Sequence, residues 1–291
     1  MIDIKDYGVF DLTPVEEIRK GLFLKRDDLF MPFKDIPLSG GKVRQAMFLV
    51  SNNYDKIVNE CGGKIVTGTS VNSPQGTIVA RVAKEFGLSS VIFVGNTTLK
   101  SLTKNNLMMN ALRCGAKINI ESRLAYDNVL SATIKRYMDA GNDCFQVKFG
   151  INLEDSPEAI LDSVAYQVQN LPNDLDILVV PCGSGITFGG ILRGLEKYNK
   201  KPKRVIGIQI SGYDRVKTVE KIMGEDYKEY EFLISKDYPY SKHVNLHAGN
   251  VDLDPIYEAK AYDYMLKNID IENKKVCFWV VGNSRMIREL K

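Results

Sequence analysis

Short apolar runs alternate along this chain with stretches whose apolar residues recur at helical spacing. A short apolar run bounded by glycine or polar residues is typical of a buried strand, whereas apolar residues three and four apart are typical of a helix packed on one face. The sequence predicts strands at residues 64–67, 91–94, 117–120, 144–147, 177–180, 205–208 and 276–281, with helices between them. Because crossover helices join parallel strands and cover both faces of the sheet, we expect an α/β fold.

The predicted elements fall into two sets, which indicates two lobes. The second set begins at Ser156-Pro157, where a capping serine precedes a proline at the first helical position. Residues 211–250 are polar, rich in tyrosine and predicted to be irregular, and a late helix is predicted to begin at Asp254-Pro255. We expect a large domain of residues 1–50 and 151–291 and a small domain of residues 51–150. Each lobe should hold a mostly parallel sheet flanked by helices, with a ligand cleft between the lobes at the carboxyl ends of the strands.

The composition is that of an ordinary globular protein. The 291 residues are enough for one large or two ordinary domains with a buried core. The chain is 44% hydrophobic and 26% charged, and its net charge of +3 is too small to indicate a nucleic acid or a membrane as a partner.

The cysteines and histidines argue against a metal site. The five cysteines are an odd number, widely separated, without a C-x-x-C spacing, and neither histidine lies near one in sequence. A metal centre or a disulfide framework is therefore not expected. We expect free thiols in a reducing cytoplasm. The first residues lack the apolar core of a signal peptide, and the longest apolar run, residues 276–281, is far too short to cross a membrane. We expect a cytoplasmic protein with no membrane segment.

A glycine-rich turn, Cys182-Gly183-Ser184-Gly185-Ile186-Thr187, follows a predicted strand and opens a predicted helix. In this setting the backbone N–H groups and the helix dipole can hold a phosphate. The spacing from Gly185 to Gly189 differs from that of a dinucleotide-binding turn, and the next strand ends in Gln209-Ile210 without an acidic residue for a ribose. The turn thus favours a single phosphate, with a tight turn that binds no ligand as the alternative.

A second polar loop, Thr69-Ser70-Val71-Asn72-Ser73-Pro74-Gln75-Gly76, also joins a predicted strand to a helix. Its hydroxyls and amides suit a carboxylate and a neutral ring oxygen at a helix start. Ordinary helix capping by the same residue types is the alternative.

Lys42 stands at a predicted helix entrance in Ser39-Gly40-Gly41-Lys42-Val43-Arg44. A nucleotide-binding P-loop would need glycine at position 36 and serine or threonine at position 43, and these hold isoleucine and valine. Taken alone, Lys42 could also be an ordinary solvated lysine.

These loops together resemble a known family. Lys25-Arg26-Asp27-Asp28-Leu29, followed by Gly40-Gly41-Lys42-Val43-Arg44, resembles the N-terminal signature of fold-type-II pyridoxal-phosphate enzymes, the tryptophan synthase β superfamily. Asn72-Ser73-Pro74-Gln75-Gly76 is similar to the asparagine loop of that superfamily, and residues 183–187 are similar to its phosphate loop. Leu253-Asp254-Pro255-Ile256-Tyr257-Glu258-Ala259 resembles the late helix of the aminocyclopropane-carboxylate deaminase and D-cysteine desulfhydrase group. The resemblance runs in family order from about residue 22 to residue 281.

The resemblance implies a tryptophan synthase β-like fold and roles for individual residues. Lys42 would carry pyridoxal 5'-phosphate as an internal aldimine and then move protons, and Asn72 would bind the 3′ oxygen of the ring. Tyr257 and Glu258 would face the substrate as catalytic residues, with an ordinary amphipathic first turn as the alternative. The phosphate would be held, largely through the backbone, by Gly183, Ser184, Gly185, Ile186 and Thr187. The substrate carboxylate would lie near Ser70, Asn72, Ser73 and Gln75.

The end loop departs from the family pattern. The partner of the ring nitrogen should come from Gly282-Asn283-Ser284, where Asn283 or Ser284 stands in place of the usual motif. Gly41 also replaces the asparagine that the family usually has before the lysine. A neutral partner such as Ser284 would favour β-elimination or β-replacement.

The resemblance predicts a pyridoxal-phosphate-dependent lyase or deaminase that acts on a small amino acid, in a homodimer. One alternative keeps the cofactor and places the amino-acid group on a nucleotide or a modified nucleic-acid base, because residues 211–250 mix tyrosines with basic residues as nucleic-acid surfaces do. A substrate lid or a dimer surface would have the same composition. A β-replacement synthase and a non-catalytic binding protein also stay open.

Overall fold

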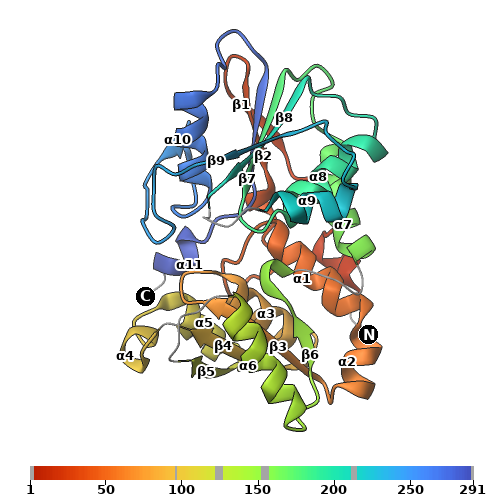
Figure 1. Cartoon of the computed structure of the whole chain (residues 1–291), viewed down its shortest axis with the longest axis vertical. Helices are drawn as coiled ribbons and strands as arrows, with labels where there is room; N and C mark the ends of the chain where they lie inside the picture. Colours follow the sequence, from red (N-terminus) through yellow and green to blue (C-terminus); the bar gives the residue numbers. More distant parts are fainter. Residues whose placement is uncertain (1–2, 96, 122–126, 152–156, 211–214, 290–291) are drawn as a thin grey trace.

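The computed structural model describes residues 3–95, 97–121, 127–151, 157–210 and 215–289, and it confirms the two-lobed α/β fold. Two sheets lie one above the other along the long axis of the molecule, and helices cover them (Figure 1). No helix of the described residues is long and apolar enough to span a membrane.

The larger sheet has six strands in the order β1-β2-β12-β7-β8-β9. The strands are β1 (Val15–Arg19), β2 (Leu22–Arg26), β7 (Ile177–Cys182), β8 (Arg204–Gln209), β9 (Glu231–Ile234) and β12 (Val276–Val280). Every pair is parallel except the β1–β2 hairpin. In β7 and β12 every residue is buried, as continuous apolar runs in a parallel sheet predict.

The smaller sheet has four parallel strands in the order β5-β4-β3-β6. The strands are β3 (Lys64–Ser70), β4 (Ser89–Gly95), β5 (Lys117–Glu121) and β6 (Phe145–Val147). Its helices are α2 (Tyr54–Glu60), α3 (Gln75–Glu85), α4 (Leu99–Leu102), α5 (Asn106–Arg113) and α6 (Asp127–Asp139). Between β4 and β5 the chain forms two helices, α4 and α5, because Asn105 caps a new helix by accepting a hydrogen bond from the Met108 N–H.

The remaining helices cover the larger sheet and join the lobes. They are α1 (Gly41–Asn52), α7 (Pro157–Ala165), α8 (Ile186–Lys197), α9 (Val216–Met223), α10 (Glu258–Asn268) and α11 (Arg285–Glu289). Helix α1 contacts α7 on one side and α3 on the other, and α11 contacts α5, so both lie at the junction of the lobes (Figure 1).

Alternate residues of each large-sheet strand enter different cores. Leu24, Val179 and Phe278 face the cluster that contains α10, whereas Leu178, Val180 and Trp279 face the cluster that contains α8. Successive side chains of a strand point to opposite faces, so a strand covered on both faces is apolar throughout. Packing on both sheet faces thus explains why these strands read as unbroken apolar runs.

The prediction that residues 211–250 are irregular is partly wrong. The described part of the segment contains α9, the edge strand β9 and β10 (His247–Ala248), which pairs with β11 (Val251–Asp252). Strand β9 is short and only partly buried, so its apolar pattern is weak. The predicted cap Ser156 lies outside the described residues.

The strands of each sheet follow the two predicted sets, with β1 and β2 in the larger sheet. The domain limits at residues 50/51 and 150/151 stay a prediction. All five cysteines are free, and four of them are buried.

Candidate functional site

A cavity lies where the carboxyl ends of β7 and β12 meet α1 and the start of α3. Its described lining comes from five segments of both lobes: Leu38, Ser39, Lys42, Pro74, Ile78, Pro181, Cys182, Gly183, Ser184, Gly185, Thr187, Phe188, Asp254, Tyr257, Glu258, Val281, Gly282, Asn283, Ser284 and Ile287. Lys42 is the only basic residue of this lining. The position matches the rule that open α/β sheets bind ligands beyond the carboxyl ends of their strands.

Lys42 lies in the first turn of α1 and lines the cavity. The helix start is fixed against β12, because the Gly41 N–H donates to the Val281 carbonyl at 2.9 Å. Burial lowers the pKa of the Lys42 amine, and the carboxylates of Glu258 and Asp254 oppose that shift only partly. An amine of lowered pKa carries a larger neutral fraction, which is the form that attacks an aldehyde or accepts a proton.

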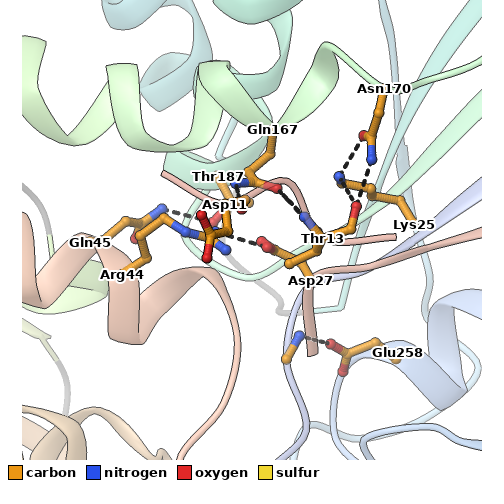
Figure 2. Close-up of polar contacts among 11 residues, drawn as sticks. Asp11, Thr13, Lys25, Asp27, Arg44, Gln45, Gln167, Asn170, Thr187 and Glu258 are labelled. Atoms are coloured by element: carbon orange, nitrogen blue, oxygen red, sulfur yellow. Dashed lines mark hydrogen bonds and ion pairs between the residues drawn. The ribbon is translucent and has the colours of Figure 1, made fainter. Parts of the chain in front are cut away.

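Residues of the Lys25–Leu29 motif pack against α1, the helix that contains Lys42 (the lysine helix). Asp27 and Arg44 are both fully buried, and the Arg44 Nη1 donates to Asp27 Oδ1 at 2.8 Å (Figure 2). The Arg44 guanidinium also stacks over the Phe30 ring at 4.3 Å from its centroid. Lys25 itself is occupied elsewhere, since its amine donates to the Thr13 carbonyl and to Asn170. Arg44 and Lys42 therefore share a helix turn that is anchored by a buried ion pair.

The glycine turn places the start of α8 at the cavity. Gly185 is the N-cap residue in a left-handed conformation, with φ of +86°, which favours glycine. A Cβ at Gly183 would lie 2.9 Å from Cε1 of the Tyr257 ring, so the turn and Tyr257 are in close contact. The α8 N-terminus presents backbone N–H groups that lack partners within the helix, which suits a phosphate. Ile186 belongs to this turn but does not line the cavity.

Tyr257 and Glu258 lie at the start of α10, and the Asp254 side chain bonds the backbone just before this helix. Asp254 Oδ1 accepts from the N–H groups of Ile256 and Tyr257, at 2.9 and 3.1 Å. Glu258 is 1% exposed, its Oε1 accepts from the Gly282 N–H at 3.0 Å (Figure 2), and its Oε2 has no partner among the described residues. Burial, with repulsion from Asp254, raises the pKa of Glu258 well above its usual range. A buried carboxyl with one unused oxygen is therefore available to a ligand.

Tyr240 was missed as a site residue by sequence reasoning. Its hydroxyl hydrogen-bonds the Tyr257 hydroxyl at 2.8 Å, and their rings meet edge to face. Burial raises the pKa of both tyrosines, so both stay neutral at ordinary pH. Lys260 fixes the Tyr240 backbone, because its amine donates to the carbonyls of Pro239 and Tyr240 at 2.9 Å each. The only sequence signal was the cluster of tyrosines in residues 211–250.

Both polar side chains of the end loop are already bonded. Ser284 Oγ donates to Asp254 Oδ2 and accepts from Arg288 Nε at 2.8 Å. The Asn283 side chain donates to the Asp252 carbonyl at 2.7 Å and accepts from the Arg285 N–H at 2.8 Å. Both residues line the cavity, and their role toward a ring nitrogen stays a prediction.

The asparagine loop lies beside the cavity, and only Pro74 of this loop lines it, followed by Ile78 on α3. The buried Gln75 amide donates to Thr67 Oγ1 and accepts from the Gly150 N–H, so it holds the loop together. The Asn72 carbonyl accepts from Arg288, which ties the loop to α11.

Ser70 and Ser73 of this loop differ in what their hydroxyls do. Ser73 Oγ accepts from the Gln75 N–H at 3.3 Å, as a cap would. Ser70 Oγ is buried next to the Tyr240 hydroxyl, and no described residue gives it a hydrogen bond of normal geometry. The substrate roles of Ser70, Asn72, Ser73 and Gln75 stay predictions.

Curated proteins resemble the chain over almost its whole length. It is 23% identical to an "O-seryl-dTMP PLP-dependent decarboxylase" of Salmonella phage ViI, over 99% of this chain and 85% of that protein. It is 24% identical to a putative 1-aminocyclopropane-1-carboxylate deaminase of Thermotoga maritima, over 93% of each.

Solved structures show the same fold. A crystal structure of an ACC deaminase homologue matches with a TM-score of 0.74 and 18% identity, over 93% of this chain and 89% of that one. The O-acetylserine-dependent cystathionine β-synthase of Helicobacter pylori matches with a TM-score of 0.68 and 18% identity, over 98% and 96%. The model of the pyridoxal-phosphate dependent enzyme family matches residues 9–231, which is more than half of the chain. A cavity that joins a lysine of lowered pKa to a glycine turn at a helix start, together with this match, leads to one conclusion: the chain belongs to the pyridoxal-phosphate-dependent enzyme family.

Proposed function

We propose that this enzyme is a lyase or deaminase that acts on a small amino acid, with Lys42 as the residue that carries the cofactor. The observation that carries the proposal is the meeting of Lys42, the Gly183–Thr187 turn and the Tyr257–Glu258 pair in one cavity. The similarity to the putative deaminase of Thermotoga maritima supports the reaction class.

The residues of the cavity fit pyridoxal phosphate. The α8 start offers unpaired N–H groups and two hydroxyls, of Ser184 and Thr187, to the phosphate. Lys42 offers an amine to the aldehyde, and Glu258 Oε2 is a buried polar atom that lacks a partner among the described residues. Because Ser284 Oγ already donates to Asp254 and accepts from Arg288, Glu258 competes with Asn283 and Ser284 as partner of the ring nitrogen. When bound, the cofactor withdraws electrons from the bonds at the substrate Cα.

The proposed carboxylate site lies at the loop that follows β3. Of the two serines predicted to bind the carboxylate, Ser70 has a buried hydroxyl without a hydrogen bond of normal geometry. Its proton can therefore be donated to a substrate carboxylate. The Gln75 amide, fully used within the protein, would act by holding this loop in place. Asn72 keeps its predicted role toward the ring oxygen.

Proton transfer is assigned to Lys42 and to the tyrosine pair. The lowered pKa of Lys42 increases the fraction of its amine that is neutral and can accept a proton, once it is no longer bound to the cofactor. With Tyr240 as the donor of the bond between the two hydroxyls, the neutral Tyr257 hydroxyl can donate its own proton in a hydrogen bond to a leaving group. Tyr257 and Glu258 therefore keep the catalytic roles proposed for them.

Reduction of the loaded protein with borohydride, followed by peptide mapping, tests the assignment. The label should appear on Lys42, and Lys42→Ala should abolish the visible absorbance of the bound cofactor while the protein stays folded. Two other lysines provide a matched control, because burial also lowers the pKa of Lys25 and of Lys260, each to about 8. A label on either of these, or an unchanged yellow Lys42→Ala protein, would refute the assignment.

A second candidate substrate is an amino-acid group carried by a nucleotide or a modified base. The phage relative named for O-seryl-dTMP favours it, because the similarity covers 99% of this chain. Burial and then the charge of Arg288 lower the pKa of His243, Asp254 opposes the shift, and Lys260 adds to it, so two cations and one carboxylate lie near the segment that holds Tyr240. Tyr213 of the predicted nucleic-acid surface lies outside the described residues. A β-replacement synthase remains a third candidate.

Measured release of carbon dioxide and ammonia separates these candidates. The deaminase proposal expects ammonia from a free D- or L-amino acid, and the carrier proposal expects turnover only when a seryl group is attached to a thymidine nucleotide. Retention on DNA that falls as salt rises would support the carrier proposal. We include a cytoplasmic homodimer in the proposal, and sedimentation tests the dimer.

A further inference from the structure

Gln45 joins the lysine helix to the phosphate turn. It lies on α1 three residues after Lys42, where residues share a helix face, and it is 0% exposed. Its Nε2 donates to Thr187 Oγ1 at 3.3 Å (Figure 2), across 142 positions of sequence. Thr187 lies in the first turn of α8 and lines the cofactor cavity, whereas Gln45 stands behind it.

The direction of this hydrogen bond determines what the Thr187 hydroxyl can do. A threonine hydroxyl has one proton and two lone pairs. Because Gln45 donates into a lone pair, the proton of the hydroxyl stays free, and no described residue accepts it. The hydroxyl therefore points a donor at whatever acceptor occupies the cavity beside the α8 start.

The charge of the cavity makes this donor important. Lys42, the only cation of the described lining, is used for the aldehyde, and the lining also contains the acidic groups Asp254 and Glu258. A phosphate that carries between one and two negative charges must therefore be bound mainly by neutral donors, namely the backbone N–H groups and the hydroxyls of Ser184 and Thr187.

We propose that Gln45 is a positioning residue that holds the Thr187 hydroxyl as a donor to the cofactor phosphate and so favours the phosphorylated cofactor over unphosphorylated pyridoxal. The proposal depends on the cofactor alone and holds whichever bond of the substrate is broken. If Gln45 only filled space in the core, its loss would weaken both forms of the cofactor equally.

Titrations of the apoprotein with pyridoxal phosphate and with pyridoxal, followed by the visible absorbance of the bound cofactor, test it. We expect Gln45→Met to raise the Kd for pyridoxal phosphate about fivefold to tenfold, as the weakening of one hydrogen bond to the phosphate would, with less than about a twofold change for pyridoxal. Gln45→Glu should raise the Kd for pyridoxal phosphate more, because a carboxylate accepts the Thr187 proton and repels the phosphate.

Two further comparisons make the result specific. Thr187→Val should remove the same preference for pyridoxal phosphate over pyridoxal. The Gln45→Met/Thr187→Val protein should bind pyridoxal phosphate no more weakly than Thr187→Val alone, because both changes act on the same hydrogen bond from Thr187 to the phosphate. Gln167→Met is the matched control, since Gln167 is also fully buried and accepts from the Thr13 hydroxyl at 3.1 Å. It should lower the melting temperature and leave the ratio of the two Kd values unchanged.

Several results would overturn the proposal. Equal weakening of both ligands by Gln45→Met, an unchanged Kd for pyridoxal phosphate, or additive effects in the double variant would each do so. If Gln45→Met does not fold, Gln45→Glu decides the matter, because it keeps the size and shape of the side chain and changes only its charge and its hydrogen-bonding groups. Stabilisation by inorganic phosphate alone, measured as a thermal shift, should then be smaller in Gln45→Glu than in the unmodified protein, and an equal shift would refute the role of Gln45.

Discussion

The buried ion pair between Asp27 and Arg44 offers a quantitative test of how the lysine helix is held. Both residues are completely buried, one bond of 2.8 Å joins them, and Asp27 Oδ2 and the Arg44 Nε and Nη2 have no partner among the described residues. Removing one member leaves a buried charge without its partner, which costs about 3–5 kcal/mol of unfolding free energy. We therefore expect Arg44→Met and Asp27→Asn each to be destabilised by that amount.

The expected change in melting temperature follows from the size of the chain. Unfolding entropy of about 2.1 cal/mol/K per residue gives about 0.6 kcal/mol/K for 291 residues, so the melting temperature should fall by about 5–8 °C. Loss of the stacking of Arg44 on Phe30, 4.3 Å from the ring centroid, adds to the effect of Arg44→Met alone. Urea denaturation of the apoprotein measures the free energy, and calorimetry measures the temperature.

A double-mutant cycle separates the pair from its surroundings. Arg44→Met/Asp27→Asn should be more stable than the sum of the single changes predicts, by about 2–3 kcal/mol, since it leaves no unpaired charge. The half-exposed Arg204–Glu231 pair, joined at 2.7 Å, is the matched control, and Arg204→Met should cost less than about 1 kcal/mol. Additive effects in the cycle, or a loss below about 1 kcal/mol in Arg44→Met, would refute the reasoning.

Three further changes test the site itself. Tyr240→Phe should cost about 1–3 kcal/mol of stability, because the buried Tyr257 hydroxyl loses its 2.8 Å partner, and it should lower kcat more than the affinity for cofactor, measured by steady-state kinetics and by absorbance titration. Cofactor loading should accelerate as pH rises through the pKa of Lys42, which burial holds below 10.5. Glu258→Gln should move the midpoint of this pH dependence to lower pH, because the ionised Glu258 carboxylate raises the pKa of Lys42. Stopped-flow measurement of loading tests this, and a midpoint at higher pH would contradict it. Gly183→Ala should weaken cofactor binding, since the new Cβ would lie 2.9 Å from the Tyr257 ring, and an unchanged Kd would show that the turn can move away.

Local pattern in the sequence was enough for the buried parallel strands of both sheets and for their order along the chain. The apolar runs in β7 and β12 are buried on both faces, and that burial requirement leaves a trace in consecutive residues. The edge strand β9 left no such trace, because it is covered only in part. The glycine turn of residues 183–187 was also recognisable, since a phosphate site at a helix start needs a particular backbone geometry within a few neighbouring positions. Lys42 was recognisable from the glycines that precede it.

The sequence by itself determined the fold class, the cofactor family and the loops that we propose carry its chemistry. Only the tertiary structure decided which side chains are already used: Ser284 is bound to Asp254, the Gln75 amide to its own loop, and Tyr240 to Tyr257. It also brought Gln45 to Thr187. The physical reason is that periodicity records whether a residue is buried, whereas a hydrogen-bond partner 17 or 142 positions away is set by how elements far apart in sequence pack against each other.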